Sequence, residues 1–529
     1  MLGSVFASTS IRQQWVVALV TACITAAVAV GIARHYELGP VDDAFISLRY
    51  AANWAGGEGL CFNPGEVVEG FTNFLLVLLI AATIRCGAEP VLAMTVIGWV
   101  TLALLSGVFA RFAIRHVFPQ RPLLSVTVAV VAVLNPVLVC WASSGLESCL
   151  YALLLMAGVT VLLDRASSNH VWLSAFLLVL AGMTRPETVA LVPAVLVVNY
   201  WVHRSGRRVV GYAGMFLVGY GVYFAVRAWH FGYLFPNTFY AKLDYGSARL
   251  LQHGVIYVYD FLCASALLFL PALAALLRID RAPVWVKAFA LIIAGQLLIV
   301  IYEGGDHFAM YRFMVPVLPF LLAVALYPCT LISRRIKHPR GSTAVLALVS
   351  IAVLAASNLW IGRQIKRDKE PQWTQFQWHR YEVDLAGQWS RLGRWFRRNV
   401  PSGSSLVNTS IGALGYYSGL TIVDPLGIVD PVIAHQRRAL GRGYRGHEKH
   451  DCAYVLSQRP DYILLVDVAT PSPIPEPALA GAVWGEFNLR LAGDPQLAQQ
   501  YRYESVAVGR YFLNIHVRRD LPRLQPGGG

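Results

Sequence analysis

Long apolar runs dominate the hydrophobic pattern of this chain. A helix needs about 20 mostly apolar residues to cross a bilayer core, and the first run of that kind covers residues 15–32. Polar residues are scarce inside the runs and collect between them. Counting each run as one helix predicts a polytopic α-helical membrane protein of about eleven spans. The ten later runs lie near 90–110, 122–141, 148–164, 171–183, 187–203, 208–229, 254–277, 284–302, 313–332 and 343–360.

The first run predicts a retained anchor rather than a cleaved signal peptide, because no small-x-small cleavage pattern follows it. One further apolar stretch, FTNFLLVLLIAATI at 71–84, is short for a span and also fits an interfacial or re-entrant helix. If it does not cross, the basic loops all fall on the side of the N-terminus, as the positive-inside rule expects for the cytoplasm. We therefore predict that it does not cross. The loops concerned are 111–121, 203–208, 278–287 and 333–340.

The chain divides, on this reading, into a membrane part at 1–360 and an extracytoplasmic tail at 361–529. The tail mixes Trp- and Arg-rich helical sequence with short β-like runs such as LTIVD and DYILLVD. A small α/β domain fits that mixture. The first outer loop, 34–89, and the tail then lie on the same side of the membrane.

Composition sharpens this picture. Hydrophobic residues make up 56% of the chain and charged residues only 14%, against about 25% charged in a typical soluble domain. These values exclude an ordinary soluble enzyme, a disordered chain and a nucleic-acid-binding protein with a polar exterior. We therefore interpret the net charge of +14 first as an indication of membrane topology, because basic residues gather in cytoplasmic loops. The eight cysteines form no CxxC or Cys/His metal spacing, so we interpret them as apolar filler.

Ionisable residues are rare within the spans, where a transporter would place them. They gather instead in five outer loops, which would bring carboxylates, cations and amides to one side of the membrane. That distribution predicts an active site at the outer water–lipid boundary. Its candidate residues are Asp42, Asp43, Glu69, Glu147, Arg185, Asn237, Tyr240, Lys242, Asp306, His307 and Arg312.

The chemistry of these side chains suits attack on a lipid-linked substrate. A partly desolvated carboxylate can take a proton from a hydroxyl nucleophile, and Arg or Lys can hold a phosphate as it leaves. The Asp42–Asp43 pair is the strongest local feature, with helix capping as its structural alternative.

Each of the other candidates has a structural alternative too. Glu147 could cap a helix, and Arg185 could simply pair with Glu187. Lys242 and Arg312 could snorkel to lipid headgroups. His307 beside Asp306 could bind a metal, although nothing else in the sequence completes a ligand set, so we predict no metal site there.

The segment VDDAFISLRYAANWAGGEGLCFNPGEVVEGFTNFL at 41–75 resembles the first outer loop of GT-C fold glycosyltransferases. It is most similar to the branch that contains the mycobacterial terminal β-(1→2) arabinofuranosyltransferase. Shorter motifs are also similar to that group: SGLE at 144–147, TRPE at 184–187, PNTFYAK at 236–242 and GGDHFAMYRF at 304–313. A looser similarity covers 415–434 in the tail.

The resemblance implies a GT-C fold with juxtamembrane helices in the first loop, the second of them at 71–84. It implies a polyprenyl-phosphate-sugar-dependent transferase, with decaprenyl-phosphoryl-arabinofuranose as donor and a cell-envelope glycan as acceptor at the periplasmic face of the bacterial inner membrane. Other prenyl-linked sugars serve related enzymes, and some carry a divalent cation on the first-loop acid.

Roles for individual residues follow from the same resemblance. Asp42 becomes the expected general base, with Asp43 as the close alternative. Glu69 and Glu147 would support substrate hydroxyls. The cations expected to hold the donor phosphate are Lys242, Arg312, His307 and Arg185.

Two other classes of function remain open from the sequence. A lipid-linked sugar transporter or flippase would need a polar path through the spans, for which the sequence offers few residues. A non-catalytic receptor or assembly protein would use the tail as a binding module and would not need the acids of the first loop.

Overall fold

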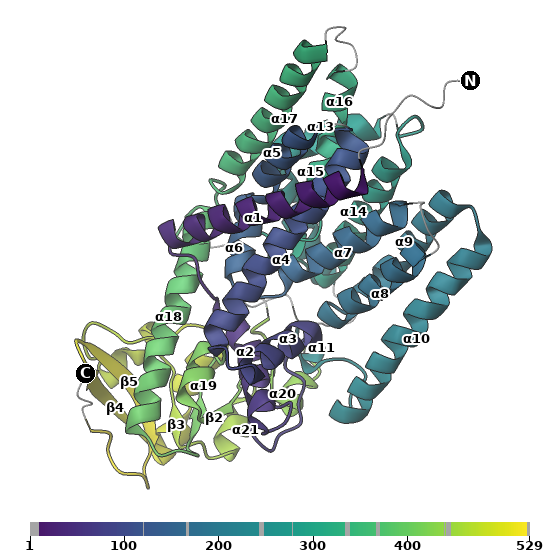
Figure 1. The fold of residues 1–529 in the computed structure, drawn as a ribbon. Coiled ribbons are helices and arrows are strands. Elements are labelled where there is room, and N and C mark those ends of the chain that lie inside the picture. The colour runs from purple at the N-terminus through teal and green to yellow at the C-terminus, as the bar shows by residue number, and fades with distance from the viewer. Residues whose placement is uncertain are drawn as a thin grey trace. The chain divides into compact units, whose positions relative to one another are not determined.

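The computed structural model describes residues 10–119, 121–164, 169–242, 248–277, 279–333, 339–366, 371–438, 440 and 446–525. The chain forms two compact units (Figure 1). The membrane unit contains 1–39, 95–225 and 251–380, and the tail unit contains 40–94, 226–250 and 381–529. The predicted boundary at 360/361 therefore differs from this division, which cuts within the tail's first helix and adds two earlier segments to the tail.

Every one of the eleven predicted spans is helical. Five are long and apolar enough to cross a membrane alone, and two more do so as bent pairs, with angles of 65° and 94°. The remaining four are apolar but shorter, and the protein is a multi-pass membrane protein. The long helices are α1 (Ile11–His35), α4 (Pro90–Phe112), α10 (Gly206–Phe231), α14 (Val284–Glu303) and α17 (Pro339–Ile361). The bent pairs are α5 (Pro122–Val133) with α6 (Pro136–Ser143) and α12 (Ala248–Ala264) with α13 (Ala266–Leu276). The shorter segments are α7 (Ser148–Leu163), α8 (Asn169–Thr184), α9 (Thr188–His203), and α15 (Leu318–Ala325) followed by α16 (Tyr327–Ser333).

Helices α1 and α4 run antiparallel. Gly107 of α4 lies so close to α1 that a Cβ there would stand 2.9 Å from the carbonyl oxygen of Ala18. Further along, Arg115 reaches Gln14, which is nearer the start of α1. The end of α1 and the beginning of α4 therefore point toward the same end of this helix pair. Helix α3 (Phe74–Arg85), which lies between them in sequence, has 12 residues and is too short to span by itself.

The tail unit is built on a five-stranded mixed sheet in the order β2-β1-β3-β5-β4 (Figure 1). Strands β2, β1 and β3 are parallel, β5 pairs antiparallel with β3, and β4 pairs antiparallel with β5. The strands are β1 (Ser405–Val407), β2 (Thr421–Val423), β3 (Tyr462–Ile463), β4 (Tyr501–Val508) and β5 (Tyr511–Arg518). The helices of this unit are α2 (Asp42–Gly56), α3, α11 (Asn237–Lys242), α18 (Gln375–Asn399, which begins in the membrane unit), α19 (Ala413–Ser418), α20 (Pro431–Ala434), α21 (Cys452–Ser457), α22 (Glu486–Ala492) and α23 (Pro495–Gln500).

Buried apolar side chains fill the tail between the sheet and its helices. Val407 and Ile463 come from neighbouring parallel strands and pack with Phe487 and Leu491 of α22. Burial of each such side chain contributes about 1.5–3 kcal/mol. The α/β character predicted for the tail from its short apolar runs is confirmed by this sheet.

The first loop belongs to the tail unit because its polar side chains bind the tail backbone. The buried guanidinium of Arg49 in α2 donates to the carbonyl oxygens of Phe62, Gly415 and Leu420 at 2.7–2.8 Å. The amide of Asn63 donates to the carbonyl oxygen of Ile422 in β2 at 2.9 Å and accepts from its N–H at 3.0 Å. These two residues join segments about 360 positions apart.

Candidate active site

The carboxyl ends of the parallel strands gather acidic and small residues at one edge of the sheet. β1 runs into the loop that holds Ser410 and Gly412, and β3 runs toward Asp467. In sheets of this kind ligands bind beyond the carboxyl ends of parallel strands. Ser410 donates from its hydroxyl to the Asp467 carboxylate at 3.1 Å.

Asp42 lies against this loop. It is the first residue of α2, where a carboxylate interacts favourably with the helix dipole. One carboxylate oxygen accepts the backbone N–H of Ala413 at 2.7 Å, and the other accepts that of Gly412 at 3.1 Å. Gly412 is required by this approach, since a Cβ there would stand 2.0 Å from the Asp42 carbonyl oxygen. Two tail amides thus fix the orientation of the first-loop acid.

The environment of Asp42 favours its neutral form. Burial raises the pKa of Asp42 to about 7, against the lowering effect of the two backbone N–H groups, and the neighbouring charges of Asp43 and Asp467 add to the rise. Asp43 follows in the same helical turn and is partly exposed. A carboxyl with a pKa near neutrality can both accept and release a proton at physiological pH.

Glu69 forms a buried ion pair with Arg227, at the end of α10. The Arg227 Nη2 lies 2.6 Å from the Glu69 Oε2, and the two side chains are only 6% and 3% exposed. Burial raises the pKa of Glu69 to about 6, and the hydrogen bond and charge of Arg227 oppose the rise. Arg227 also donates to the carbonyl oxygen of Leu234 at 2.7 Å. The pair therefore joins the first loop to the segment that follows α10.

Asn237 stands beside this pair. Its backbone N–H donates to the carbonyl oxygen of Glu69 at 2.9 Å. Its side-chain amide donates to the carbonyl oxygens of Gly427 and Ile428, at 2.8 and 3.1 Å. Loop 424–429, which follows β2, is thereby held to the first loop and to α11.

Tyr240 and Lys242 lie further along α11. The Tyr240 ring stacks on His435 with centroids 4.0 Å apart. Its carbonyl oxygen accepts a hydrogen bond from Lys449 at 2.8 Å. The methylenes of Lys242 pass close to Gly446. Asp42 and Asp43 thus lie at the sheet edge, and Glu69, Asn237, Tyr240 and Lys242 lie on the loops around α11. All six belong to the tail unit.

The other predicted residues lie in the membrane unit, in two ion-paired groups. Arg185 occupies the break between α8 and α9, 2.9 Å from Glu147 and 2.5 Å from Glu187. Glu147 immediately precedes α7. Pairing of Arg185 with Glu187, the structural alternative for this arginine, is therefore present. Glu147 stands at the N-cap position of α7 but makes no side-chain capping hydrogen bond.

The second group is formed within loop 304–313. Arg312 Nε lies 2.6 Å from Asp306 Oδ2, and both side chains are more than nine-tenths buried. His307 donates its backbone N–H to Asp306 at 2.8 Å. The ring of Phe313 lies between the two groups, 4.9 Å from the Arg185 guanidinium and 5.1 Å from that of Arg312. The two arginines therefore share one aromatic neighbour.

Loop 304–313 has an unusual backbone conformation. Met310 and Tyr311 both adopt positive φ, at 56° and 47°, a conformation that costs about 1–3 kcal/mol for each non-glycine residue. Gly305 adopts φ 74° against the Tyr257 ring, where a Cβ would approach to 2.4 Å. Met310 is held from both sides, since its carbonyl oxygen accepts Trp141 Nε1 at 2.7 Å and its N–H donates to Gln375 at 2.8 Å.

Sequence reasoning missed several residues that organise these groups. Arg227 lies near the end of an apolar span, where a single arginine usually extends its side chain toward the lipid headgroups. Gly412, Ala413 and Asp467 are remote from Asp42 in sequence, and no local pattern marks their contact. Arg49 could have been found from the sequence, because it is an isolated cation on an otherwise apolar face of a helix.

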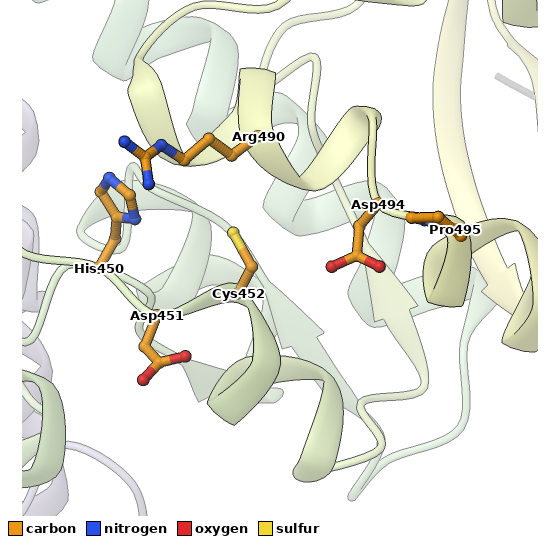
Figure 2. Close-up of a pocket in the computed structure, with 6 residues that line it drawn as sticks. All are labelled: His450, Asp451, Cys452, Arg490, Asp494 and Pro495. Carbon is orange, nitrogen blue, oxygen red and sulfur yellow. The ribbon is translucent and has the colours of Figure 1, made fainter.

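A pocket of about 340 Å³ also opens in the tail, as Figure 2 shows. None of the residues predicted from the sequence lines it. Burial raises the pKa of the Cys452 thiol within it to about 11. Its lining residues are His450, Asp451, Cys452, Arg490, Asp494 and Pro495. Among the described residues, no three His, Cys, Asp or Glu side chains gather as a metal site.

The helices and the tail sheet together define the class: the chain is a polytopic membrane protein with the GT-C fold and a small C-terminal sheet domain. The structure of ArnT from Cupriavidus metallidurans bound to undecaprenyl phosphate is similar to it, with a TM-score of 0.58 and 13% identity over 97% of this chain and 99% of that one. The apo form of the same protein gives 0.55 and 13%, over 93% and 97%.

A second neighbour is the oligosaccharyltransferase AglB from Archaeoglobus fulgidus, in complex with an inhibitory peptide and a dolichol-phosphate. It gives a TM-score of 0.50 and 12% identity, over 96% of this chain and 75% of that one. A family model described as "Domain of unknown function (DUF8728)" matches residues 372–517. Comparison with curated protein sequences gives no match.

Proposed function

We propose that this protein is a membrane glycosyltransferase that moves a sugar from a polyprenyl-phosphate donor to a hydroxyl group of an acceptor. The observation that carries the proposal is Asp42, whose carboxylate is held by the N–H groups of Gly412 and Ala413 and whose pKa is about 7. The fold supports it, because ArnT has been seen with undecaprenyl phosphate and AglB with a dolichol-phosphate.

Asp42 acts as the general base in this proposal. The acceptor hydroxyl gives its proton to the Asp42 carboxylate while its oxygen forms a bond to the anomeric carbon of the donor. The bond from that carbon to the phosphate oxygen breaks, and the polyprenyl phosphate leaves with the electron pair. Asp43, one residue along α2, is the alternative base. Its charge also helps to keep the pKa of Asp42 high.

The leaving phosphate gains negative charge and needs cations. Arg185 and Arg312, which share the ring of Phe313, are the proposed partners, with His307 beside them and Lys242 on α11. Both arginines already contact carboxylates. Those ion pairs hold the two guanidinium planes in place.

Arabinofuranose is the proposed sugar and a cell-envelope glycan the proposed acceptor. Both rest on the similarity of segment 41–75 to arabinofuranosyltransferases. The proposed location is the inner membrane, with the tail and the first loop on the periplasmic side, and the basic loops support that orientation. Glu69 and Asn237 are proposed to shape the acceptor side of the site through the loops that they join.

The test is a transfer assay with purified protein and a panel of prenyl-phosphate sugars that includes decaprenyl-phosphoryl-arabinofuranose. Asp42→Asn and Asp43→Asn are compared with Glu58→Gln, which removes an exposed carboxylate from the same loop. We expect transfer by the parent chain and by Glu58→Gln, and a loss of about 10²–10⁴-fold when the base is removed. Full activity in both aspartate variants would refute the site. Movement of lipid-linked sugar across vesicles without transfer would instead establish a transporter.

A further inference from the structure

A compact basic cluster lies in the membrane unit at the end of α7 that is remote from Glu147. Its centre is Asp164, the residue after α7, whose side chain is 3% exposed. Arg111 Nη2 and Arg115 Nη1 lie 3.0 and 2.8 Å from the same Asp164 oxygen, Oδ2. Both arginines come from the last turns of the α4 span. Their side chains remain 19% and 26% exposed, so solvent or lipid can reach them.

The length of α4 places this cluster at the level of lipid headgroups. With its terminal π-helical turn, Ala113–Val117, the span has 28 residues, or about 42 Å at 1.5 Å per residue. A bilayer hydrocarbon core is only about 30 Å thick. Arg111 is 21 positions after Pro90, about 32 Å along the axis. If Pro90 lies at one interface, the two guanidinium groups lie at the other. π-Helical turns of this kind are frequent at functional sites.

The charges within the cluster do not balance. Two guanidinium groups meet one carboxylate and use a single oxygen of it, which leaves a net charge of +1 among these three residues. The Nε–H of Arg111 is buried and has no hydrogen-bond partner within the described part of the chain. A buried donor without an acceptor is costly, and an anionic oxygen at this position would satisfy it.

An apolar stripe on α1 adjoins the cluster. The Arg111 guanidinium lies 5.0 Å from the ring of Trp15. Ile11, Trp15 and Leu19 follow at helical spacing along one face, with 72%, 59% and 66% of their surfaces exposed. Tryptophan with aliphatic neighbours is typical of the membrane interface. A basic pocket that continues into an apolar stripe matches the two parts of a phospholipid.

We propose that Arg111 and Arg115 bind the phosphate of an anionic phospholipid headgroup, with an acyl chain lying along Ile11, Trp15 and Leu19. Guanidinium groups bind phosphate oxygens with paired hydrogen bonds. Asp164 holds the two arginines in position while leaving the cluster positive. The site is independent of the proposed transfer reaction and lies at the far end of α7 from Glu147.

The experiment measures thermal unfolding of the purified full chain in a neutral detergent. Short-chain phosphatidylglycerol, phosphatidylcholine and inorganic phosphate are added separately, and native mass spectrometry counts retained lipid. The variants are R111Q/R115Q, R111K/R115K and D164N. R281Q, which removes one exposed charge elsewhere in the membrane unit, is the matched control.

We expect phosphatidylglycerol to stabilise the parent chain and R281Q, and phosphatidylcholine to do so much less. R111Q/R115Q should bind phosphatidylglycerol at least about tenfold more weakly, and R111K/R115K about fivefold, because it keeps the charges but loses the paired hydrogen bonds. D164N is the decisive variant. The proposal expects it to be less stable without lipid and to gain more from phosphatidylglycerol than the parent, because two unpaired cations remain.

An internal ion pair with no lipid role predicts the opposite for D164N, namely a loss that lipid does not restore. That result would overturn the proposal. Equal stabilisation by the two lipids, or an unchanged response of R111Q/R115Q to phosphatidylglycerol, would overturn it as well. Protection by inorganic phosphate alone would reassign the cluster to a soluble anion and refute the lipid assignment.

Discussion

The carboxylate of Asp42 is anchored by the backbone N–H of Gly412, a residue 370 positions further along the chain. In the proposed reaction, this contact gives the tail a role in orienting the base. The acid proposed to take the acceptor proton is oriented by the loop after β1. A displacement of the loop after β1 should therefore turn the Asp42 carboxylate even when the sequence of the first loop is unchanged.

Replacement of Gly412 by alanine tests this relationship. A Cβ at Gly412 would come within 2.0 Å of the Asp42 carbonyl oxygen and 2.9 Å of its carboxyl carbon. We expect a fall in kcat of about a hundredfold, as a shift of about 1 Å in a catalytic group produces. The matched control is Gly481→Ala, since a Cβ there meets nothing within 4 Å. Equal activity of the two variants would contradict the anchoring role.

The dependence of transfer on pH follows from the pKa of Asp42. A general base works only when deprotonated, so with a pKa of about 7 the rate should rise with pH through neutrality and fall about tenfold per unit below it. An ordinary aspartate, with a pKa near 4, would leave the rate flat from pH 5 to 8. Removing the charge of the neighbouring residue, in Asp43→Asn, should shift the midpoint to lower pH. The measurement is kcat/KM between pH 5 and 9, and a flat profile would exclude Asp42 as the base.

The same pKa has a consequence for stability with the opposite sign. The unfolded chain ionises Asp42 near pH 4 and the folded chain near pH 7. The ionised carboxylate is therefore less favourable in the folded state, and this contribution to stability decreases as the pH rises from about 4 toward 7. Asp42→Asn should remove that part of the pH dependence, which thermal unfolding at a series of pH values would detect.

Glu69 and Arg227 should behave as a structural pair. Breaking a buried pair by removing one partner costs about 3–5 kcal/mol, because a charge remains uncompensated. We therefore expect Glu69→Gln and Arg227→Met each to lower the unfolding temperature strongly. The double variant should be more stable than either single one. If Glu69→Gln instead keeps full stability and raises KM for the acceptor, Glu69 binds substrate directly.

Arg312 should act on the donor. Lysine in its place keeps the positive charge but loses the forked N–H geometry against Asp306 and the donor phosphate. A charge-assisted hydrogen bond is worth about 1.5–3 kcal/mol, so Arg312→Lys should raise KM for the donor about tenfold or more. KM for the acceptor should stay constant. A change confined to the acceptor would assign loop 304–313 to the other substrate.

Much of the architecture could be predicted from the sequence, because the signals that specify it are local. The apolar runs gave the positions of all eleven helical segments, and the brevity of 71–84 anticipated the 12-residue α3. The bounds were close as well: α7, α8 and α9 have 16 residues each, against runs at 148–164, 171–183 and 187–203. The break between α5 and α6 falls at Asn135–Pro136, a pair typical of helix starts that a count of apolar runs does not use. The break between α12 and α13 falls at Ser265, within an otherwise apolar run.

The candidate site was predictable in its residue types and only partly in its contacts. Asp42 and Asp43 stand out beside an apolar span, and Arg185 stands out beside Pro186. The partner of Glu69, Arg227, lies 158 positions away. Long-range pairing of this kind depends on how the helices are arranged in three dimensions, which the hydrophobic pattern does not encode. Arg49 and Asn63 likewise join the first loop to backbone groups of the tail about 360 positions away, and no local pattern marks these contacts.

The contact of Asn63 with Ile422 has a further consequence. Strand β2 is the last strand on its side of the sheet, and the Asn63 amide satisfies both backbone groups of Ile422 as a neighbouring strand would. A tail produced alone, without residues 40–94, would present an open strand edge with unpaired N–H and C=O groups. Such edges recruit other strands. We therefore expect the first loop to protect the tail from self-association.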